Sequence, residues 1–253
     1  MDLKIHFALA AFVFAVAVSV PAAAGQFKLY DGKSAADIVV DAGDYKVVRI
    51  AGDAFAGDVQ LVTGVKPSVK TAPDKKTKRA VIIGTIEKSA VIKKLIGAKK
   101  IDVSKIRGKW ETFIIVSVAK PLPGVESALV VAGSDRRAAA FGAFEVSQRI
   151  GVSPWVWWAD VKPEKKKSLI VNSDGAAAGP PSVKYRGIFL NDEDFGLKPW
   201  SAKTLEPETG DIGPKTYARI FELLLRLKAN HIWPAMHKCT HAFNHYDRNK
   251  FVA

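Results

Sequence analysis

Short apolar runs, separated by polar or turn-forming residues, fill the first two thirds of the chain. Runs that are rich in Val and Ile and bounded by Gly, Pro, Asp or Lys are typical of β-strands. Several of these runs are apolar throughout, which predicts strands that are buried on both faces of a sheet. We expect strands at residues 38–40, 45–50, 59–62, 80–86, 112–118, 128–132 and 169–171.

Two segments with helical spacing alternate with these strands. Residues 89–96 and 135–150 each follow an expected strand, and apolar residues recur in the second at three- and four-residue intervals. Ser134 is placed to cap the second helix, and Gly151 to end it. Because strands and helices alternate, the sequence predicts a small α/β domain over residues 25–178.

A second pattern begins after a loop-like segment. Residues 172–182 are rich in Asn, Ser, Asp, Gly, Ala and Pro, which indicates a linker and the only clear domain boundary. A strand at residues 185–190 is followed by a loop and then by a helix that begins at Pro214 and ends near Asn230. The next strand, at residues 231–234, completes a βαβ unit whose two strands should be parallel.

One βαβ unit cannot cover its own strands, and a complete (β/α)8 barrel takes roughly 250 residues. We therefore expect residues 183–253 to form the first βαβ unit of an incomplete barrel. The expected fold class is α/β, with a small N-terminal α/β domain before a truncated (β/α)8 barrel. On this interpretation the sequence is an N-terminal fragment of a longer enzyme.

The beginning of the chain has the pattern of a secretory signal peptide over residues 1–24. Lys4 supplies a positive charge, residues 7–20 are apolar, and the small residues before Gly25 fit signal cleavage. A membrane anchor is the alternative, but Pro21 and the short apolar length argue against it. We expect a secreted or periplasmic protein that has no membrane contact after cleavage.

The formal net charge of +13 is unevenly distributed along the chain. Residues 66–109 contain fourteen Lys or Arg and three Asp or Glu. Nucleic-acid binding would need aromatic groups among these cations, and only Trp110 lies at the edge of the segment, so we expect a solvated basic face and no nucleic-acid partner. The single cysteine, Cys239, excludes intramolecular disulfides and suits export to a bacterial periplasm or outer surface.

The strand expected at residues 185–190 ends in a polar cluster of Asn191, Asp192, Glu193 and Asp194. Neighbouring carboxylates repel one another and raise one another's pKa, so a purely structural strand gains nothing from this ending. Carboxylates serve as acid and base in glycoside hydrolysis, and they also hold sugar hydroxyls. A helix cap or a solvated acidic turn is the alternative.

Two further segments carry groups that suit sugars or anions. Trp157 and Trp158 lie in a loop with high aromatic density, where they could be faces for sugar rings or a buried plug between domains. Ser134, Asp135 and Arg136 lie at a strand-to-helix turn, where backbone N–H groups attract anions. Many structural turns in α/β proteins have the same composition.

Three histidines, His237, His241 and His245, follow the last expected strand. Their spacing of four residues would place them on one helix face, as a helical zinc site requires. No His-Glu-x-x-His motif accompanies them, and Cys239 is out of phase, so we expect no metal. His237 alone, at the end of the strand, is the better candidate for a substrate contact.

Longer motifs surround these candidates. They read Gly151-Val-Ser-Pro-Trp-Val-Trp-Trp-Ala-Asp160, Tyr185-Arg-Gly-Ile-Phe-Leu-Asn-Asp-Glu-Asp-Phe195, Glu206-Pro-Glu-Thr-Gly-Asp-Ile-Gly-Pro-Lys-Thr-Tyr217 and Leu227-Lys-Ala-Asn-His-Ile-Trp-Pro-Ala-Met-His237. Together they resemble glycoside hydrolase family 115, the xylan α-1,2-glucuronidases.

The resemblance implies removal of (4-O-methyl-)glucuronic acid from xylan side chains by inversion, with no cofactor and no metal. It implies that the polar strand ending lines the glucuronate pocket and that the principal acid and base lie beyond Ala253. The implied supporting catalytic residues are Asp192, Glu193 and Asp194, and the implied substrate-binding residues are Ser134, Asp135, Arg136, Trp157, Trp158, Asn191 and His237.

We therefore expect the full-length protein to be a glycosyl hydrolase, an α-glucuronidase, that acts on glucuronoxylan or its oligosaccharides. The resemblance also allows a homodimer of the full-length protein. This chain alone should be inactive, because most of the barrel strands are missing. The alternative is a non-catalytic fragment that binds acidic glycan through the basic face and the Trp-rich loop.

Overall fold

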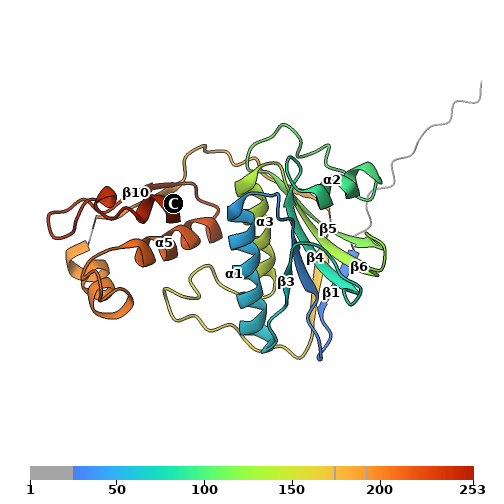
Figure 1. The fold of residues 1–253 in the computed structure, drawn as a ribbon, viewed down its shortest axis with the longest axis horizontal. Coiled ribbons are helices and arrows are strands. Elements are labelled where there is room, and N and C mark those ends of the chain that lie inside the picture. The colour runs from blue at the N-terminus through green and yellow to red at the C-terminus, as the bar shows by residue number, and fades with distance from the viewer. Residues whose placement is uncertain (1–24, 174, 192) are drawn as a thin grey trace, which may run out of the picture.

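The computed structural model describes residues 25–173, 175–191 and 193–253 (Figure 1). The expected signal peptide and Asp192 lie outside these described residues. The elements are β1 (Gly25–Tyr30), β2 (Asp37–Val40), α1 (Lys46–Thr63), β3 (Val69–Lys70), β4 (Arg79–Thr85), α2 (Ala90–Gly97), β5 (Phe113–Ala119), β6 (Ser127–Gly133), α3 (Arg136–Arg149), β7 (Leu169–Ser173), β8 (Ala177–Ala178), β9 (Gly187–Phe189), the π-helix η1 (Glu193–Leu197), α4 (Lys198–Trp200), the π-helix η2 (Ser201–Leu205), α5 (Pro214–Arg226), β10 (His231–Trp233), the 3-10 helix η3 (Phe243–His245) and α6 (Asn249–Val252).

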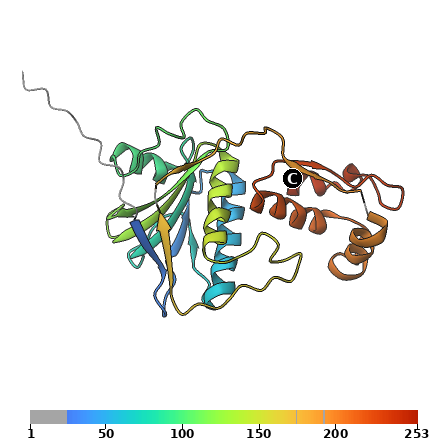
Figure 2. The same cartoon turned by 180° about the vertical axis from the view of Figure 1, so that it is seen from behind.

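A six-stranded sheet forms the larger part of the molecule, in the order β3-β2-β4-β6-β5-β8. Strands β2, β3, β4 and β6 are parallel, and β5 pairs antiparallel with β6 and β8. Helices α1 and α3 cover one face side by side, whereas α2 packs on the other (Figures 1 and 2). Because both faces are covered, β4 and β6 are buried along almost their whole length, as the apolar runs predicted.

The strands expected at residues 45–50 and 59–62 are wrong, because Tyr45 is the N-cap of α1 and the other residues lie within this helix. Val48, Ala51, Phe55, Val59 and Val62 are fully buried on one helix face, at the helical spacing of three and four residues. The β-branched residues in each short run suggested strands, although the longer apolar period is that of a helix. The sequence pattern also does not predict β1, which pairs antiparallel with β7.

The helices expected at residues 89–96 and 135–150 are confirmed as α2 and α3. The cap of α3 is Asp135 rather than Ser134, since an Asp135 carboxylate oxygen accepts a hydrogen bond from the Ala138 N–H at 2.8 Å. The Ser134 hydroxyl instead accepts the Thr112 N–H at 3.0 Å, which joins the ends of β6 and β5.

The C-terminal part contains the expected parallel βαβ unit. Strands β9 and β10 pair in parallel, and α5 begins at Pro214 as predicted. The left-handed residue after α5 is Lys228, with a φ of 56°, rather than Asn230. The loop expected before Pro214 contains η1, α4 and η2. A separate apolar cluster around Tyr217 and Ile220 packs α5 against this unit.

Buried ion pairs connect the βαβ unit to the six-stranded sheet. The Arg226 guanidinium at the end of α5 donates to both carboxylate oxygens of Asp58 in α1, at 2.8 and 2.9 Å. Burial raises the pKa of Asp58, against the lowering effect of Arg226. Removing one partner of such a pair typically costs about 3–5 kcal/mol, because the other charge stays buried. The two parts are therefore coupled through specific charges.

Candidate functional site

The candidate site lies where β9 and β10 end. The two strands are parallel, with Ile188 beside Ile232, so the segments that follow them leave the same edge of the sheet. Side chains placed at the carboxyl ends of neighbouring parallel strands are positioned to form one site. The segment after β9 carries Asn191, which is exposed, and Asp192, which the structure does not describe.

Glu193 connects the two strand ends. Its side chain is buried, with a relative exposure of 2%, and Glu193 is the first residue of η1. The carboxylate oxygen Oε1 accepts the backbone N–H of Met236, beyond β10, at 3.1 Å. Glu193 is therefore a buried bridge between the segments rather than part of a solvated acidic turn.

Asp194 and His237 face each other across the same gap. The Asp194 Oδ2 lies 3.0 Å from the His237 Nδ1, and both side chains are about half exposed at 41% and 51%. Hydrogen bonding from the Cys239 thiol, together with the nearby His237, lowers the pKa of Asp194. Loss of hydration and the Asp194 carboxylate raise the pKa of the Cys239 thiol to about 11. Asp194 is thus held as an accessible carboxylate beside an imidazole.

A second buried carboxylate, Asp211, fixes the segment after β10. It accepts hydrogen bonds from the Thr240 hydroxyl, from the His241 N–H at 3.0 Å and from the Tyr246 hydroxyl at 3.1 Å. Burial opposes the charged form, but these bonds outweigh it and hold the pKa of Asp211 well below its usual range. Asp211 was not among the candidates from the sequence, because its partners lie about thirty positions away.

The Glu206 side chain caps the N-terminus of α5. Its buried carboxylate accepts the backbone N–H groups of Gly213, Lys215 and Thr216 at 3.0–3.1 Å. Acidic groups at a helix N-terminus satisfy unpaired donors and complement the helix dipole. The Glu206 to Tyr217 motif therefore has a structural explanation, in which a carboxylate from the preceding turn caps the helix.

The two tryptophans expected to meet the substrate pack beside Trp200. The ring centroids of Trp157 and Trp158 lie 5.5 and 5.6 Å from that of Trp200. Trp158 also contacts the C-terminal apolar cluster, and the Arg219 guanidinium lies 4.8 Å from the Trp157 ring centroid. The three rings are partly exposed, so they join the two parts of the molecule and still offer some aromatic surface.

The structure does not bring the Ser134–Arg136 turn to the other predicted residues. An Asp135 oxygen accepts the Glu111 N–H at 2.7 Å, and the Glu111 carboxylate binds Asn230 and Arg186. Asn230 and Arg186 immediately precede β10 and β9, so this network lies at the amino ends of the strands. The turn is therefore next to the edge opposite Asp194 and His237.

Nor do the three histidines share a helix face. His241 Nδ1 lies 2.7 Å from Asp211, and the His241 and His245 rings stack with centroids 3.9 Å apart. His237 lies before them in a turn, and the only helix in this stretch is the short η3. The three histidines therefore do not form one group, whereas His237 lies close to the side chains of Asp194 and Cys239.

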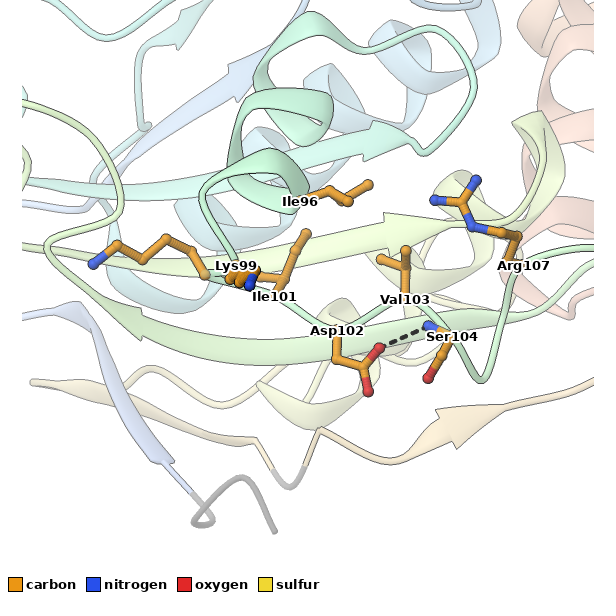
Figure 3. Close-up of a pocket in the computed structure, with 8 residues that line it drawn as sticks. Ile96, Lys99, Ile101, Asp102, Val103, Ser104 and Arg107 are labelled. Atoms are coloured by element: carbon orange, nitrogen blue, oxygen red, sulfur yellow. Dashed lines mark hydrogen bonds between the residues drawn. The ribbon is translucent and has the colours of Figure 1, made fainter. Parts of the chain in front are cut away.

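Two shallow depressions lie elsewhere, on the six-stranded sheet part. One, of about 420 Å³, follows α2 and is lined by Lys99, Lys100 and Arg107 together with Ile101 and Asp102 (Figure 3). The other, of about 680 Å³, shares Lys100 and adds further lysines, Lys78, Lys94 and Lys120. Within the part of the chain that the structure describes, none of these lysines forms an ion pair. The basic segment therefore presents free cations.

Comparisons with known proteins identify relatives for both parts. Residues 178–253 match the family model described as glycosyl hydrolase family 115. Over 89% of the chain, the structure is similar to BtGH115A, a family GH115 4-O-methyl-α-glucuronidase with specificity for decorated arabinogalactans, at 42% sequence identity and a TM-score of 0.75. The chain spans 28% of that protein's length.

A more remote similarity is to the D313N mutant of Streptomyces plicatus β-hexosaminidase, at 14% identity and a TM-score of 0.44 over 84% of this chain and 32% of that one. The comparison with curated proteins gave no match. Among the described helices, none has the length and apolar character needed to cross a membrane. The resemblance noted in the sequence is confirmed: residues 178–253 match glycosyl hydrolase family 115, and most of the chain is similar in structure to a member of that family.

Proposed function

We propose that the full-length protein is a glycoside hydrolase that removes (4-O-methyl-)glucuronic acid side chains from xylan. The observation that carries the proposal is the meeting of Glu193, Asp194 and His237 at the carboxyl ends of two parallel strands. The similarity to BtGH115A supports it, since that protein is a 4-O-methyl-α-glucuronidase with specificity for decorated arabinogalactans.

Each residue of the cluster has a role that fits its surroundings. Asp194, whose pKa is lowered, accepts hydrogen bonds from sugar hydroxyls as a carboxylate. His237 donates a ring N–H to the substrate, and Asn191 offers an amide from the exposed strand end. Glu193 holds the two segments together by accepting the Met236 N–H, and Asp192 is proposed as a further supporting residue from its place in the sequence. These residues support catalysis, while the principal acid and base belong to later strands beyond Ala253.

The proposed architecture rests on the same similarity to family 115. Residues 1–24 are a signal peptide, residues 25–178 an N-terminal α/β domain and residues 183–253 the beginning of a (β/α)8 catalytic barrel. In such barrels the active site lies at the carboxyl ends of the strands, which is where Asp194 and His237 lie. We further propose that the protein is secreted or periplasmic, where it meets plant glycans.

The activity is tested by assaying the full-length protein for release of glucuronate from glucuronoxylan and from glucuronate-decorated arabinogalactan. We expect release from xylan, and no turnover by the 253-residue chain alone. Faster release from arabinogalactan would show that xylan is not the preferred polymer, but it would still support glucuronate removal as the reaction. Robust turnover by the 253-residue chain would contradict the placement of the acid and base outside it.

A second function, non-catalytic binding of acidic glycan, is favoured by the free lysines around Lys100. Cations without ion-pair partners attract polyanions, and added salt screens such exposed charges. Calorimetry of this chain with glucuronoxylan separates the two functions. Salt-sensitive binding that Lys94→Gln and Lys100→Gln weaken, but Asp194→Asn does not, would support the second function.

A further inference from the structure

Three different metal-binding atoms converge at the strand-end cluster. A carboxylate oxygen of Asp194, a ring nitrogen of His237 and the sulfur of Cys239 all lie within 4.8 Å of one another. In a tetrahedral zinc site, ligand atoms at about 2.0–2.3 Å from the metal lie roughly 3.3–3.6 Å apart. Small side-chain rotations therefore suffice to close the three atoms around one cation. We propose that, in the absence of glycan, Asp194, His237 and Cys239 bind a thiophilic divalent cation, with zinc as the preferred ion, so that the cation and the sugar acid compete for Asp194 and His237.

The backbone around these ligands is already fixed. His237 and Cys239 share one turn, which the Thr240 N–H closes on the His237 carbonyl at 3.1 Å. The Thr240 hydroxyl and the N–H of the next residue donate to buried Asp211, which anchors the turn. On the other side, Asp194 follows Glu193, whose carboxylate is bonded to the segment after β10. The two backbone segments that carry the ligands are thus fixed by hydrogen bonds that do not involve a cation.

The donor set selects for zinc over the harder cations. Zinc is bound by sulfur, imidazole nitrogen and carboxylate oxygen, whereas magnesium and calcium prefer oxygen alone. Three protein ligands leave one position for water. The thiol loses its proton to solvent when the metal binds, so the Cys239–metal bond replaces the S–H bond. Glu193 adds a second negative charge nearby, and Lys198 opposes it with one positive charge.

Cobalt(II) titration of the purified chain, with the thiol kept reduced, tests the site directly. We expect one equivalent to bind with a near-ultraviolet thiolate-to-cobalt band that zinc then abolishes. Because the chain has a single cysteine, this band can come only from Cys239. Cys239→Ser should remove the band, and His237→Ala should weaken zinc binding by at least about tenfold.

His245→Ala is the matched control, because it removes a neighbouring histidine outside the three ligands and should leave zinc affinity unchanged. Far-ultraviolet circular dichroism confirms that each variant is folded. Zinc binding without a thiolate band, or with equal affinity in Cys239→Ser, would overturn the proposal, as would no binding. The titration contains no glycan, so its result is independent of the proposed glucuronidase activity.

Discussion

The six-stranded sheet and the β9–α5–β10 unit both combine parallel strands with helices, yet their strands are covered very differently. In the sheet, helices lie on both faces, and Val81 and Val131 in its central strands are fully buried. In the βαβ unit, Phe189 and Trp233 are 49% and 56% exposed. The first part encloses a large core, whereas the second combines a small apolar cluster with buried charges and a helix cap.

The two parts should therefore respond differently to substitution. In the sheet part, stability comes mainly from apolar burial spread over many residues. In the βαβ unit, a few polar groups, Asp58 with Arg226, Glu206 and Asp211, make the contacts that fix the chain. Single polar substitutions should therefore damage the unit that carries the candidate site while leaving the sheet largely intact.

The largest effect is expected for Arg226→Leu. It leaves the buried Asp58 carboxylate without its partner, which should cost about 3–5 kcal/mol. Hydrogen exchange should show lost protection in α5 and β10 and retained protection in β4 and β6. The double variant Asp58→Leu/Arg226→Leu should recover much of the loss, since apolar replacement of a buried pair is often neutral. Equal loss of protection in the sheet would contradict the comparison.

A smaller effect is expected for Glu206→Gln. The neutral amide accepts hydrogen bonds from the α5 N-terminus more weakly, and we expect a loss of about 1–2 kcal/mol in denaturant unfolding. Glu208→Gln is the matched control, because Glu208 is half exposed and pairs only with Lys215. Exposed pairs of this kind contribute about 0–1 kcal/mol, so the control should change little. Equal losses of stability in the Glu206→Gln and Glu208→Gln variants would show that the Glu206 cap does not stabilise the protein.

The pH dependence of the unfolding free energy should depend on Asp211. Its pKa is lowered in the folded protein, so its stabilising contribution is present above the ordinary aspartate pKa. That contribution is lost as the pH falls through the lower folded value, because the unfolded chain then binds the proton more readily. Asp211→Asn should flatten the acid limb of the stability curve, measured by unfolding at a series of acidic pH values. An unchanged acid limb would contradict this role.

The smallest effect is expected for Phe189→Ala. Because the ring is half exposed, its removal should change the unfolding free energy by about 0.5 kcal/mol. Phe141→Ala, at a fully buried position in α3, is the comparison and should cost about 3–5 kcal/mol. Similar losses at the two positions would mean that the β9 face is covered in solution.

The sequence predicted the elements whose pattern is local. The apolar runs at β4, β5 and β6 and the Pro214 start of α5 were predictable, because strand burial and helix entry depend on neighbouring residues. Helix α1 was missed because its short Val-rich stretches look like strands when taken separately. The pairing of β1 with β7 joins residues far apart in the chain, which no local pattern reports.

The candidate site was predictable only in part. Asn191 to Asp194 and His237 were identifiable because polar residues follow apolar strands, and the structure brings Glu193, Asp194 and His237 together. Helical spacing places Cys239 out of phase with the histidines, but residues 237–240 form a turn that brings Cys239 close to His237. Ser134 to Arg136 were included for their helix N-terminus, although Asp135 is already engaged there by Ala138 and Glu111.

The most direct test of the proposed glucuronate site is the kcat/KM of the full-length Asp194→Asn variant on glucuronoxylan. We expect a loss of at least about 100-fold, because the carboxylate that faces His237 becomes a neutral amide. Asp247→Asn, at an exposed carboxylate near the end of the chain, should retain normal activity. A folded Asp194→Asn enzyme with unchanged kcat/KM would contradict the account.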